Sequence, residues 1–365
     1  MSSSISRSLA ALALGTTALV AGCGGTSNPT PGSSPADVGS GSLQGSGSSF
    51  VKPYLDAAAY QFTQLHSAVT VNYPGGGSSQ GIKDFTNKTV DFGCSDVPMK
   101  DSDITAAGGA DTLVQVPAAL GTVAIAYRLD GYTGKVNLDG TTLAAIFLGK
   151  VKKWNDPAIA ALNSGASLPS KDIAVQHRSD GSGTTYIFTD YLSKVSPDWK
   201  AGPATGKTVS WPAGTGSPQN SGVGNGVANT DGAIGYVELA YVINSGGKVS
   251  QAYLKNKDGK LVQASAAGGS AAASKATGIS PTNFSIVDQA GADSYPIAGF
   301  TWCFLRTDQA DATKGKALVN FFKFATADGQ QYGKALGYSA LPKEVTDLAA
   351  TTLKTVKSAG KAILS

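Results

Sequence analysis

Residues 173–194 read IAVQHRSDGSGTTYIFTDYLSK, and this stretch decides the fold. The β-rich run Ile173–His177 leads into the turn HRSDGSGT, and a helical pattern follows over Thr184–Lys194. The turn therefore joins the C-terminal end of a strand to the N-terminal end of a helix, the edge at which open α/β sheets bind ligands. A helix N-terminus offers free backbone N–H groups, and Arg178 adds a guanidinium suited to two oxygens of one anion. The stretch predicts an α/β fold and makes this turn a candidate anion site.

Three further turns rich in Gly and Ser occupy comparable places. They are GSGSSF at Gly45–Phe50, GGGSSQG at Gly75–Gly81 and GCSD at Gly93–Asp96. Any one of the four turns, taken alone, is more typical of an ordinary helix N-cap than of a ligand site, and Asp180 beside Arg178 is compatible with a simple surface ion pair. Four such turns in a chain with only 15% charged residues nevertheless favour a site where they converge on a tetrahedral anion.

Short β-rich runs alternate with helical patterns along the rest of the body, which predicts α/β layers. The expected strands are Thr70–Tyr73, Val90–Gly93, Leu113–Val116, Thr122–Tyr127, Ile173–His177, Ala233–Tyr236 and Gly299–Leu305. The expected helices are Pro53–Leu65, Thr141–Leu148, Thr184–Lys194, Gly315–Ala325 and Pro342–Lys357. Residues 262–280 are biased towards Ala, Ser and Gly and predict a weak helix or a loop.

The composition narrows the function. At about 150 residues per domain, a chain of 365 residues predicts two domains, and 41% hydrophobic residues suffice for a sizeable core. The net charge of +4 comes without a run of Lys or Arg, so nucleic acid is not expected as a partner. Two His and three Cys argue against a zinc site, and the sequence lacks the glycine motifs of nucleotide-binding loops. We therefore expect no metal and no cofactor.

The N-terminal segment predicts export. A positively charged start precedes the apolar stretch Leu9–Val20, which is too short to span a bilayer but suits the core of a signal peptide. The stretch ends in Val-Ala-Gly-Cys23, which looks like a bacterial lipobox, so we expect residues 1–22 to be removed and Cys23 to be lipidated. The alternative is a plain signal peptide, with Cys23 an ordinary residue. Residues 23–42 then form a Gly/Ser/Pro tether, and the body lies outside the cytoplasm, anchored to a membrane by lipid.

Two cysteines remain in the body, Cys94 and Cys303. An even count in an exported protein favours a disulfide, and the alternative is two buried free thiols. A bridge requires Cα atoms within about 7 Å of each other, a condition that depends on the fold.

One motif points to catalysis instead. Gly77–Gly81, GSSQG, fits the G-x-S-x-G pattern of a nucleophilic serine at Ser79, and His177 follows it in the chain order of a triad. Short matches of this kind are expected by chance in a chain so rich in Ser and Gly. An extracellular phosphatase or esterase is therefore the alternative to a binding protein, and a surface interaction protein on the same scaffold is a third class.

The turns, in this order, closely resemble those of the substrate-binding lipoproteins of the bacterial phosphate ABC transporter, the Pst system. The resemblance begins at about Leu43, and the segments that carry it are VNYPGGGSSQGIKDF, VDFGCSDVPM, IFLGKVKKWNDPAIAALN, HRSDGSGTT, AIGYVELAY and YPIAGFTWCFL. It implies a two-domain, type II periplasmic-binding-protein-like fold (a Venus flytrap), in which each domain is a mixed sheet flanked by helices and the ligand lies in the cleft.

By the same resemblance, the domains are residues 43–121 plus 298–365 for domain I and 122–297 for domain II. The chain would cross between them near Gly121 and Ala298. The returning strand of domain I would lie beside the strand that ends near Cys94, which brings Cys303 close and supports a disulfide.

The resemblance also implies a set of ligand contacts. Carried over position by position, the expected phosphate contacts are Ser49, Phe50, Ser78, Asp96, Arg178, Ser182, Gly183 and Thr184. Asp180 would hold the guanidinium of Arg178 in place. Ser49 stands where the family usually has Thr, which keeps the hydroxyl, and Ser48 is the alternative hydroxyl at this turn.

Asp96 is the informative contact. A carboxylate that faces an anion is repelled unless the anion carries a proton that the carboxylate can accept. Phosphate near neutral pH is HPO₄²⁻ or H₂PO₄⁻ and has such a proton, whereas sulfate has none and would leave two acceptors opposed. Sites built around one substrate hydroxyl reject analogues that lack it by roughly 10⁴–10⁵, and arsenate, which shares the proton, should be excluded much less. The alternative role of Asp96 is that of an ordinary turn residue after the strand.

These observations together predict high-affinity binding of inorganic phosphate outside the cytoplasm and its delivery to the permease and ATPase of an ABC transporter. We expect a monomeric receptor without enzymatic activity. Its lipid anchor would hold it at the cell membrane, facing the periplasm or the extracellular side.

Overall fold

The computed structural model describes residues 37–364, and residues 38–364 belong to one compact unit. The expected signal peptide, Cys23 and the expected tether as far as residue 36 lie outside the described residues. The strands are β1 Gly41–Gly47, β2 Val69–Asn72, β3 Phe92–Ser95, β4 Leu113–Tyr127, β5 Asn137–Leu138, β6 Ala174–Arg178, β7 Thr215–Ser217, β8 Ala233–Glu238, β9 Ser250–Gln251, β10 Tyr253–Lys255, β11 Leu261–Val262, β12 Ala298–Arg306, β13 Lys357–Ser358 and β14 Lys361–Ala362. The α-helices are α1 Lys52–Leu65, α2 Ser78–Thr86, α3 Asp101–Ala106, α4 Gly140–Phe147, α5 Pro157–Ala160, α6 Gly183–Val195, α7 Pro197–Ala201, α8 Gln219–Asn229, α9 Leu239–Ile243, α10 Ala266–Ala273, α11 Ala312–Ala325 and α12 Lys343–Leu353. The 3₁₀ helices are η1 Ala110–Thr112 and η2 Asp328–Leu336.

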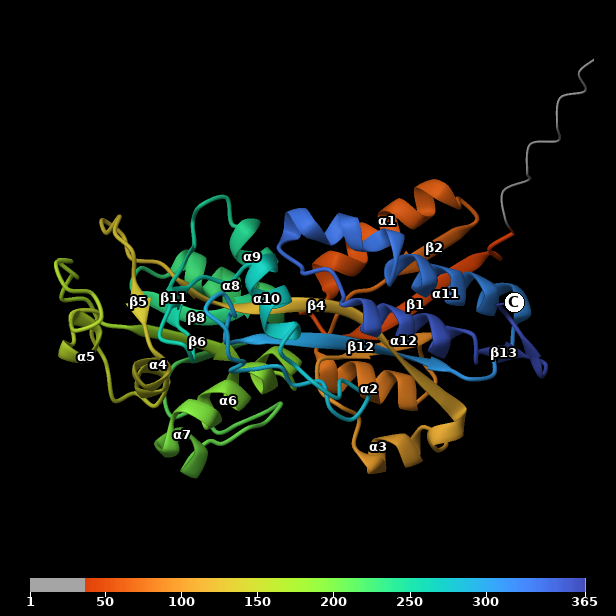
Figure 1. Cartoon of the computed structure of the whole chain (residues 1–365), viewed down its shortest axis with the longest axis horizontal. Coiled ribbons are helices and arrows are strands. Elements are labelled where there is room, and N and C mark those ends of the chain that lie inside the picture. The colour runs from red at the N-terminus through yellow and green to blue at the C-terminus, as the bar shows by residue number, and fades with distance from the viewer. Residues whose placement is uncertain (1–36, 365) are drawn as a thin grey trace, which may run out of the picture. The chain divides into compact units, whose positions relative to one another are not determined.

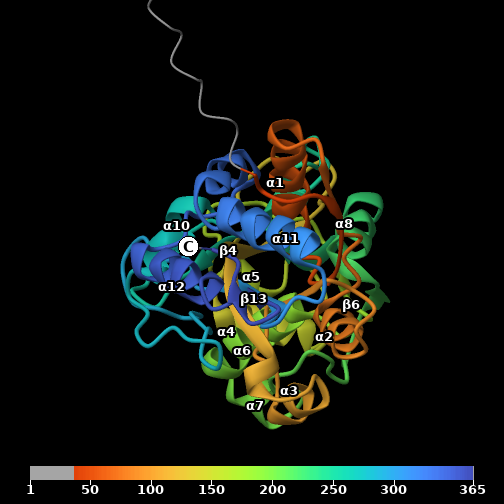
Figure 2. The same cartoon turned by 90° about the vertical axis from the view of Figure 1, so that its right-hand side faces the viewer.

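The strands build one large mixed sheet in the order β2-β1-β3-β12-β4-β8-β6-β7, with β9 also paired to β4. The long strand β4 runs through its middle, and Figure 1 shows α1, α2 and α11 at one end of that strand and α4, α6 and α8 at the other. The helices α1 and α11 cover one face of the sheet, whereas α2 and α3 cover the other (Figure 2). This is the mixed α/β architecture that the alternating pattern predicts.

The strand β4 changes partner halfway along its length. Residues 113–122 pair antiparallel with β12, and residues 123–127 pair antiparallel with β8. The change falls next to the pair formed by Thr122 and Ala298, where the chain is expected to cross between its two domains. Strand β4 therefore runs through both halves of the sheet, and the domain boundaries themselves stay a prediction.

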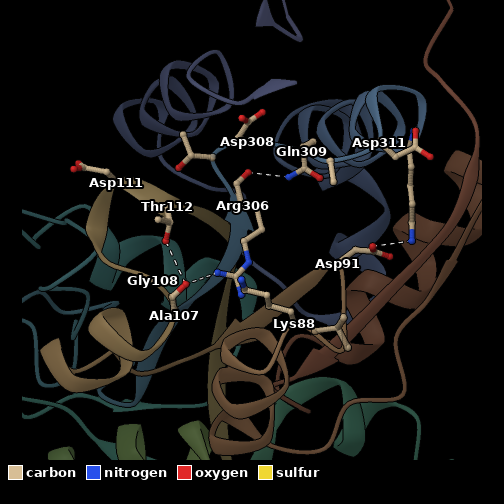
Figure 3. A pocket seen from close by; sticks show the side chains of 14 residues that line it. Lys88, Asp91, Ala107, Gly108, Asp111, Thr112, Arg306, Asp308, Gln309 and Asp311 are labelled. Carbon is tan, nitrogen blue, oxygen red and sulfur yellow. Dashed lines mark hydrogen bonds and ion pairs between the residues drawn. The ribbon is translucent and has the colours of Figure 1, made fainter. Parts of the chain in front are cut away.

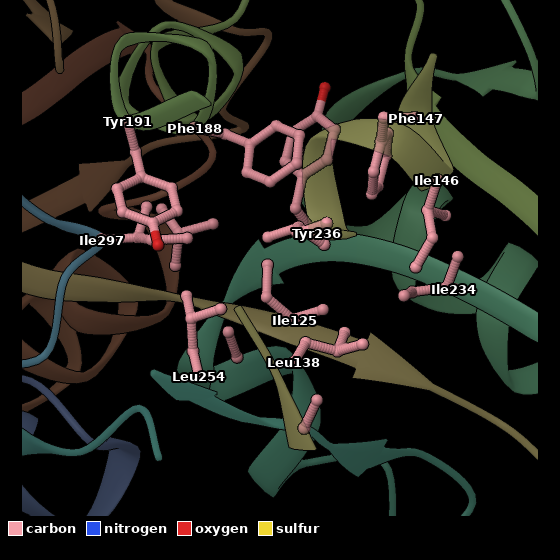
Figure 4. Packing of buried hydrophobic residues seen from close by; sticks show 14 of the residues in the cluster. Ile125, Leu138, Ile146, Phe147, Phe188, Tyr191, Ile234, Tyr236, Leu254 and Ile297 are labelled. Atoms are coloured by element: carbon pink, nitrogen blue, oxygen red, sulfur yellow. The ribbon is translucent and has the colours of Figure 1, made fainter. Parts of the chain in front are cut away.

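Aromatic packing holds α6 against the sheet. Phe188 of α6 stacks on Tyr236 of β8 with 4.3 Å between ring centroids, and Phe147 of α4 meets Phe188 edge-on at 4.8 Å (Figure 4). All three side chains are fully buried, so each removes a large apolar area from water. This packing fixes the N-terminus of α6, at Gly183, at the edge of the sheet.

The predicted disulfide is confirmed. Cys94 of β3 and Cys303 of β12 face each other directly across an antiparallel pair, with Cα atoms 4.0 Å apart, and their sulfurs are bonded. The bridge therefore ties together two neighbouring central strands that lie far apart in the sequence.

The predicted strands and helices are present with differences in their bounds, and several elements were not predicted, among them helix α8. The predicted strands Leu113–Val116 and Thr122–Tyr127 form the single strand β4, because the sheet accommodates Pro117 through a register shift against β12 between Thr301 and Trp302. The helix predicted over Pro342–Lys357 ends at Leu353. Strand β1 was not predicted. Its sequence, GSLQGSG, has a single apolar residue and thus no recognisable period, and it begins inside the range expected to be tether.

Candidate functional site

The four turns contact one another at one edge of the sheet. Gly77 N–H donates to the Gly47 carbonyl at 2.7 Å and joins the second turn to the first. Ser79 N–H donates to the Gly181 carbonyl at 3.0 Å and joins the second turn to the fourth. The third turn contacts the first and the second through the side chain of Asp96. The ends of β1, β3 and β6 and the beginnings of α1, α2 and α6 therefore lie together, as the sequence pattern predicts.

Asp96 is buried directly after β3 and accepts hydrogen bonds from three hydroxyls. Its Oδ2 accepts from Ser48 at 2.6 Å and more weakly from Ser78 at 3.4 Å, and its Oδ1 accepts from Thr301 at 2.5 Å. Burial raises the pKa of Asp96 from 3.8 to about 6, although these hydroxyls and the charge of Arg178 oppose the rise. The carboxyl is thus mainly ionised at neutral pH, and with about four lone-pair directions it can accept one further donor.

Arg178 lies at the end of β6 with its side chain only 1% exposed. Asp180 grips the guanidinium from one side, accepting from Nε at 2.7 Å and from Nη2 at 2.5 Å. On the other side Nη1 donates to Thr184 Oγ1 at 3.3 Å. Burial of Asp180 is outweighed by its bonds to Arg178, so the pKa of Asp180 lies below its ordinary value. The paired carboxylate thus fixes the orientation of Arg178, and these contacts use three of the five N–H groups of the guanidinium.

The N-terminus of α6 faces Asp96 at very close range. Ser182 caps the helix by accepting from Thr185 N–H at 3.0 Å. A Cβ atom built on Gly183 would lie 2.3 Å from Asp96 Oδ2 and 2.5 Å from Ser78 Oγ. Only a residue without a side chain fits between this helix start and the two turns.

The first turn presents two hydroxyls with different partners. Ser48 Oγ accepts from Phe50 N–H at 3.0 Å and donates to Asp96. Ser49 Oγ accepts from both the backbone N–H and the Nδ2 of Asn220, each at 3.0 Å. The two serines of this turn therefore have different partners. Ser48 Oγ hydrogen-bonds Asp96, and Ser49 Oγ hydrogen-bonds Asn220 of α8.

Several residues around the site were not predicted from the sequence. They are the buried Tyr73, Asn220, Thr301 and Tyr338 and the half-buried Tyr241. The hydroxyls of the three tyrosines donate one each to the three consecutive carbonyls of Ser48–Phe50, at 2.9 Å for Tyr73 and for Tyr241. These bonds hold the peptide groups of the first turn in one orientation. Tyr241 and Thr301 lie in segments that carry the family resemblance, but a single Tyr or Thr does not reveal which backbone group it meets.

One small cavity borders this site, and a larger hollow lies away from it. A small cavity of about 90 Å³ is lined by Asp96, by Tyr186 and Ile187 of α6 and by residues 282–285. A larger hollow of about 680 Å³ surrounds Arg306 at the end of β12 and contains none of the predicted site residues (Figure 3). Within residues 37–364, no cluster of three or more His, Cys, Asp or Glu is placed to hold a metal ion. Within the same residues, no helix has the length and apolar character needed to cross a bilayer.

Comparisons with known proteins agree on one family. The family described as PBP superfamily domain matches residues 32–328. The phosphate-binding protein PstS of Xylella fastidiosa (strain 9a5c) is 40% identical over 306 residues, which cover 82% of this chain and 81% of that protein. The phosphate-binding protein PstS of Haemophilus influenzae is 38% identical over 317 residues, covering 86% of this chain and 93% of that protein.

The fold has counterparts among solved structures. A high-affinity periplasmic phosphate-binding protein (PfluDING), determined with bound phosphate at pH 8.5, has a TM-score of 0.70 and 23% identity, covering 85% of this chain and 93% of its own. At this identity the likeness concerns the fold alone. By sequence and by fold, the chain belongs to the PBP superfamily and, within it, to the family of PstS phosphate-binding proteins.

Proposed function

We propose that this chain binds inorganic phosphate where its four turns meet and delivers it to the membrane permease of an ABC transporter. The observation that carries the proposal is the buried Asp96, an ionised acceptor with room for one more donor, at a place otherwise built from donors. An anion bound there must offer a proton to Asp96, which phosphate does and sulfate does not. The names of the PstS relatives support the same ligand.

The proposed contacts divide by charge and chemistry. Arg178, held by Asp180, supplies the positive charge and has two N–H groups left for ligand oxygens. The remaining donors proposed to contact phosphate are the hydroxyls and backbone N–H groups of Ser49, Phe50, Ser78, Ser182, Gly183 and Thr184. Charge-assisted hydrogen bonds of this kind contribute about 1.5–3 kcal/mol each. Such donors can hold a dianion without a second cation.

The wider arrangement completes the proposal. Domain I would comprise 43–121 with 298–365, and domain II 122–297, closing on the ligand about β4 and β12. The body would stand outside the cytoplasm on a tether that ends in lipidated Cys23, and phosphate would pass from the closed site to the permease and its ATPase. The motivation for the anchor is the Val-Ala-Gly-Cys sequence that ends at this cysteine.

Catalysis by Ser79 and His177 receives no support from the geometry. The His177 ring stacks on Trp211 with 4.7 Å between centroids, and its Nδ1 lies 3.0 Å from the Arg178 carbonyl. Ser79 instead contacts the fourth turn through its backbone N–H. A binding role without turnover therefore fits the site better than a phosphatase or esterase role.

Isothermal titration of the soluble body, residues 37–365, with phosphate and then with sulfate tests the proposal. We expect tight binding of phosphate and sulfate binding weaker by roughly 10⁴-fold or more. The Arg178→Ala variant should bind phosphate at least about 100-fold more weakly, because it loses a buried charge-assisted contact. Comparable affinities for the two anions would refute the specificity, and an unchanged affinity in Arg178→Ala would remove this residue from the site.

A further inference from the structure

Asn220 is a fully buried amide at the start of α8 that lies between two proposed phosphate ligands. Its Nδ2 donates to Ser49 Oγ at 3.0 Å and to Thr184 Oγ1 at 2.9 Å. These two hydroxyls belong to the first and the fourth turn, one on each side of the predicted domain boundary. The amide therefore joins ligands that the chain brings from opposite halves of the sheet.

The orientation of the Asn220 amide follows from its third contact. The backbone N–H of Glu238, at the end of β8, points at the side chain of Asn220 at 2.9 Å. A backbone N–H can only donate, so the amide atom that faces it must be the oxygen Oδ1. The NH₂ group must then face the hydroxyls of Ser49 and Thr184, with one hydrogen for each.

This arrangement fills the accepting positions of both hydroxyls. A hydroxyl has one hydrogen to donate and two lone pairs to accept with. Ser49 Oγ accepts from the Asn220 backbone N–H and from its Nδ2, and Thr184 Oγ1 accepts from Asn220 Nδ2 and from Arg178 Nη1. With both lone pairs occupied, each hydroxyl can interact with a further group only by donating its proton.

We propose that Asn220 is a positioning residue that fixes the Ser49 and Thr184 hydroxyls as donors to the bound anion. The inference rests on the proposed phosphate function and deepens it, because it explains how freely rotating hydroxyls acquire a defined polarity. The Ser48 and Thr301 hydroxyls, by contrast, donate their protons to Asp96 and not to the ligand. The ligand therefore meets fixed donors at Ser49 and Thr184 and a fixed acceptor at Asp96, so its proton is directed to Asp96.

A mutant cycle separates this role from simple packing. Phosphate affinity is measured by titration for wild type, Asn220→Ala, Ser49→Ala and the double variant, and again with Thr184→Val in place of Ser49→Ala. We expect Asn220→Ala to weaken phosphate at least about 10-fold in the wild-type background. In the Ser49→Ala and Thr184→Val backgrounds the same change should cost at least about 3-fold less, since one of the hydroxyls that it orients is already gone. Asn229→Ala, at the exposed end of the same helix, is the matched control and should leave affinity unchanged.

A second variant keeps the test informative if Asn220→Ala fails to fold. Asn220→Asp keeps an oxygen for the Glu238 N–H but replaces the NH₂ group with an acceptor that draws both hydroxyl protons away from the ligand. Its added charge acts equally in each background, so its extra cost in wild type over the Ser49→Ala background reports the hydroxyl effect. Equal factors in all backgrounds, for either Asn220 variant, would overturn the inference while leaving phosphate binding intact. Failure of the wild-type chain to bind phosphate would instead defeat the proposed function.

Discussion

If Asp96 contacts the ligand as proposed, a single proton on the anion decides whether its carboxylate accepts that anion. Replacing Asp96 by Asn keeps the size of the side chain but adds an NH₂ group that can donate to an unprotonated oxygen. We expect the preference for phosphate over sulfate to fall by at least about 100-fold in Asp96→Asn. Sulfate should bind more tightly and phosphate more weakly, and both changes lower the preference. Titration with both anions measures it, and Asp111→Asn, at an exposed carboxylate outside the site, is the control. Full exclusion of sulfate by the variant would contradict the role of Asp96.

The same carboxyl should make the ligand-free protein less stable as pH rises. Burial raises the pKa of folded Asp96 to about 6 from an ordinary 3.8, so between these values the folded state holds more protons than the unfolded state. The free energy of unfolding therefore falls with increasing pH across this interval, by an amount on the order of 1–3 kcal/mol for this group. Urea unfolding at pH 4, 5, 6 and 7 should show this slope in wild type relative to Asp96→Asn. Parallel pH profiles for the two proteins would show that the shift is absent.

Among the elements, helix α6 places its first residue closer to the other turns than any side chain allows. In Gly183→Ala the new Cβ would meet Asp96 Oδ2 and Ser78 Oγ, so either α6 or these two side chains must shift. Alanine suits a helix better than glycine does by up to about 1 kcal/mol, so the variant should stay folded. We expect phosphate affinity to fall at least about 100-fold with little change in the melting temperature. Gly224→Ala on α8, where a Cβ meets only Tyr241 at an ordinary 3.7 Å, should bind phosphate normally. Unchanged affinity in Gly183→Ala would show that this close approach is not needed for binding.

The elements also show why the sequence predicts the four turns of the candidate site better than the residues that hold those turns in place. The turns are readable because Gly, Ser and Arg178 are local signals next to strands and helices with clear periods. The three tyrosines contact backbone carbonyls, and Asn220 contacts side-chain hydroxyls, that lie far away in the sequence, and such pairings arise only from the fold. Strand β1 escaped prediction for a related reason, since Leu43 alone gives no alternation and its neighbours in the sheet stabilise it.

On the scale of the whole molecule, the candidate site depends on strands that lie far apart in the sequence. Strand β3 ends in the turn with Asp96, and β12, which returns about two hundred residues later, supplies Thr301 to hold Asp96 Oδ1. The disulfide between Cys94 and Cys303 locks these two strands in register. The pair of strands that carries the disulfide therefore also positions the proposed ligand contact Asp96.

Removal of that disulfide should lower both the stability and the affinity of the protein. The bridge closes a loop of 209 residues, and disulfides with long loops typically contribute about 2–5 kcal/mol by restricting the unfolded chain. In Cys94→Ala/Cys303→Ala we expect the free energy of unfolding to fall by about this amount, and phosphate to bind more weakly because β3 and β12 position Asp96 and Thr301 less firmly. Saturating phosphate should still stabilise the variant, by about 2.7 kcal/mol at a concentration one hundred times its dissociation constant. Urea unfolding with and without phosphate measures both effects, and a reductant should destabilise wild type but leave the variant unchanged. If the variant matched wild type in stability and in affinity, the strand pair would hold its register, and with it the position of Asp96, without the covalent link.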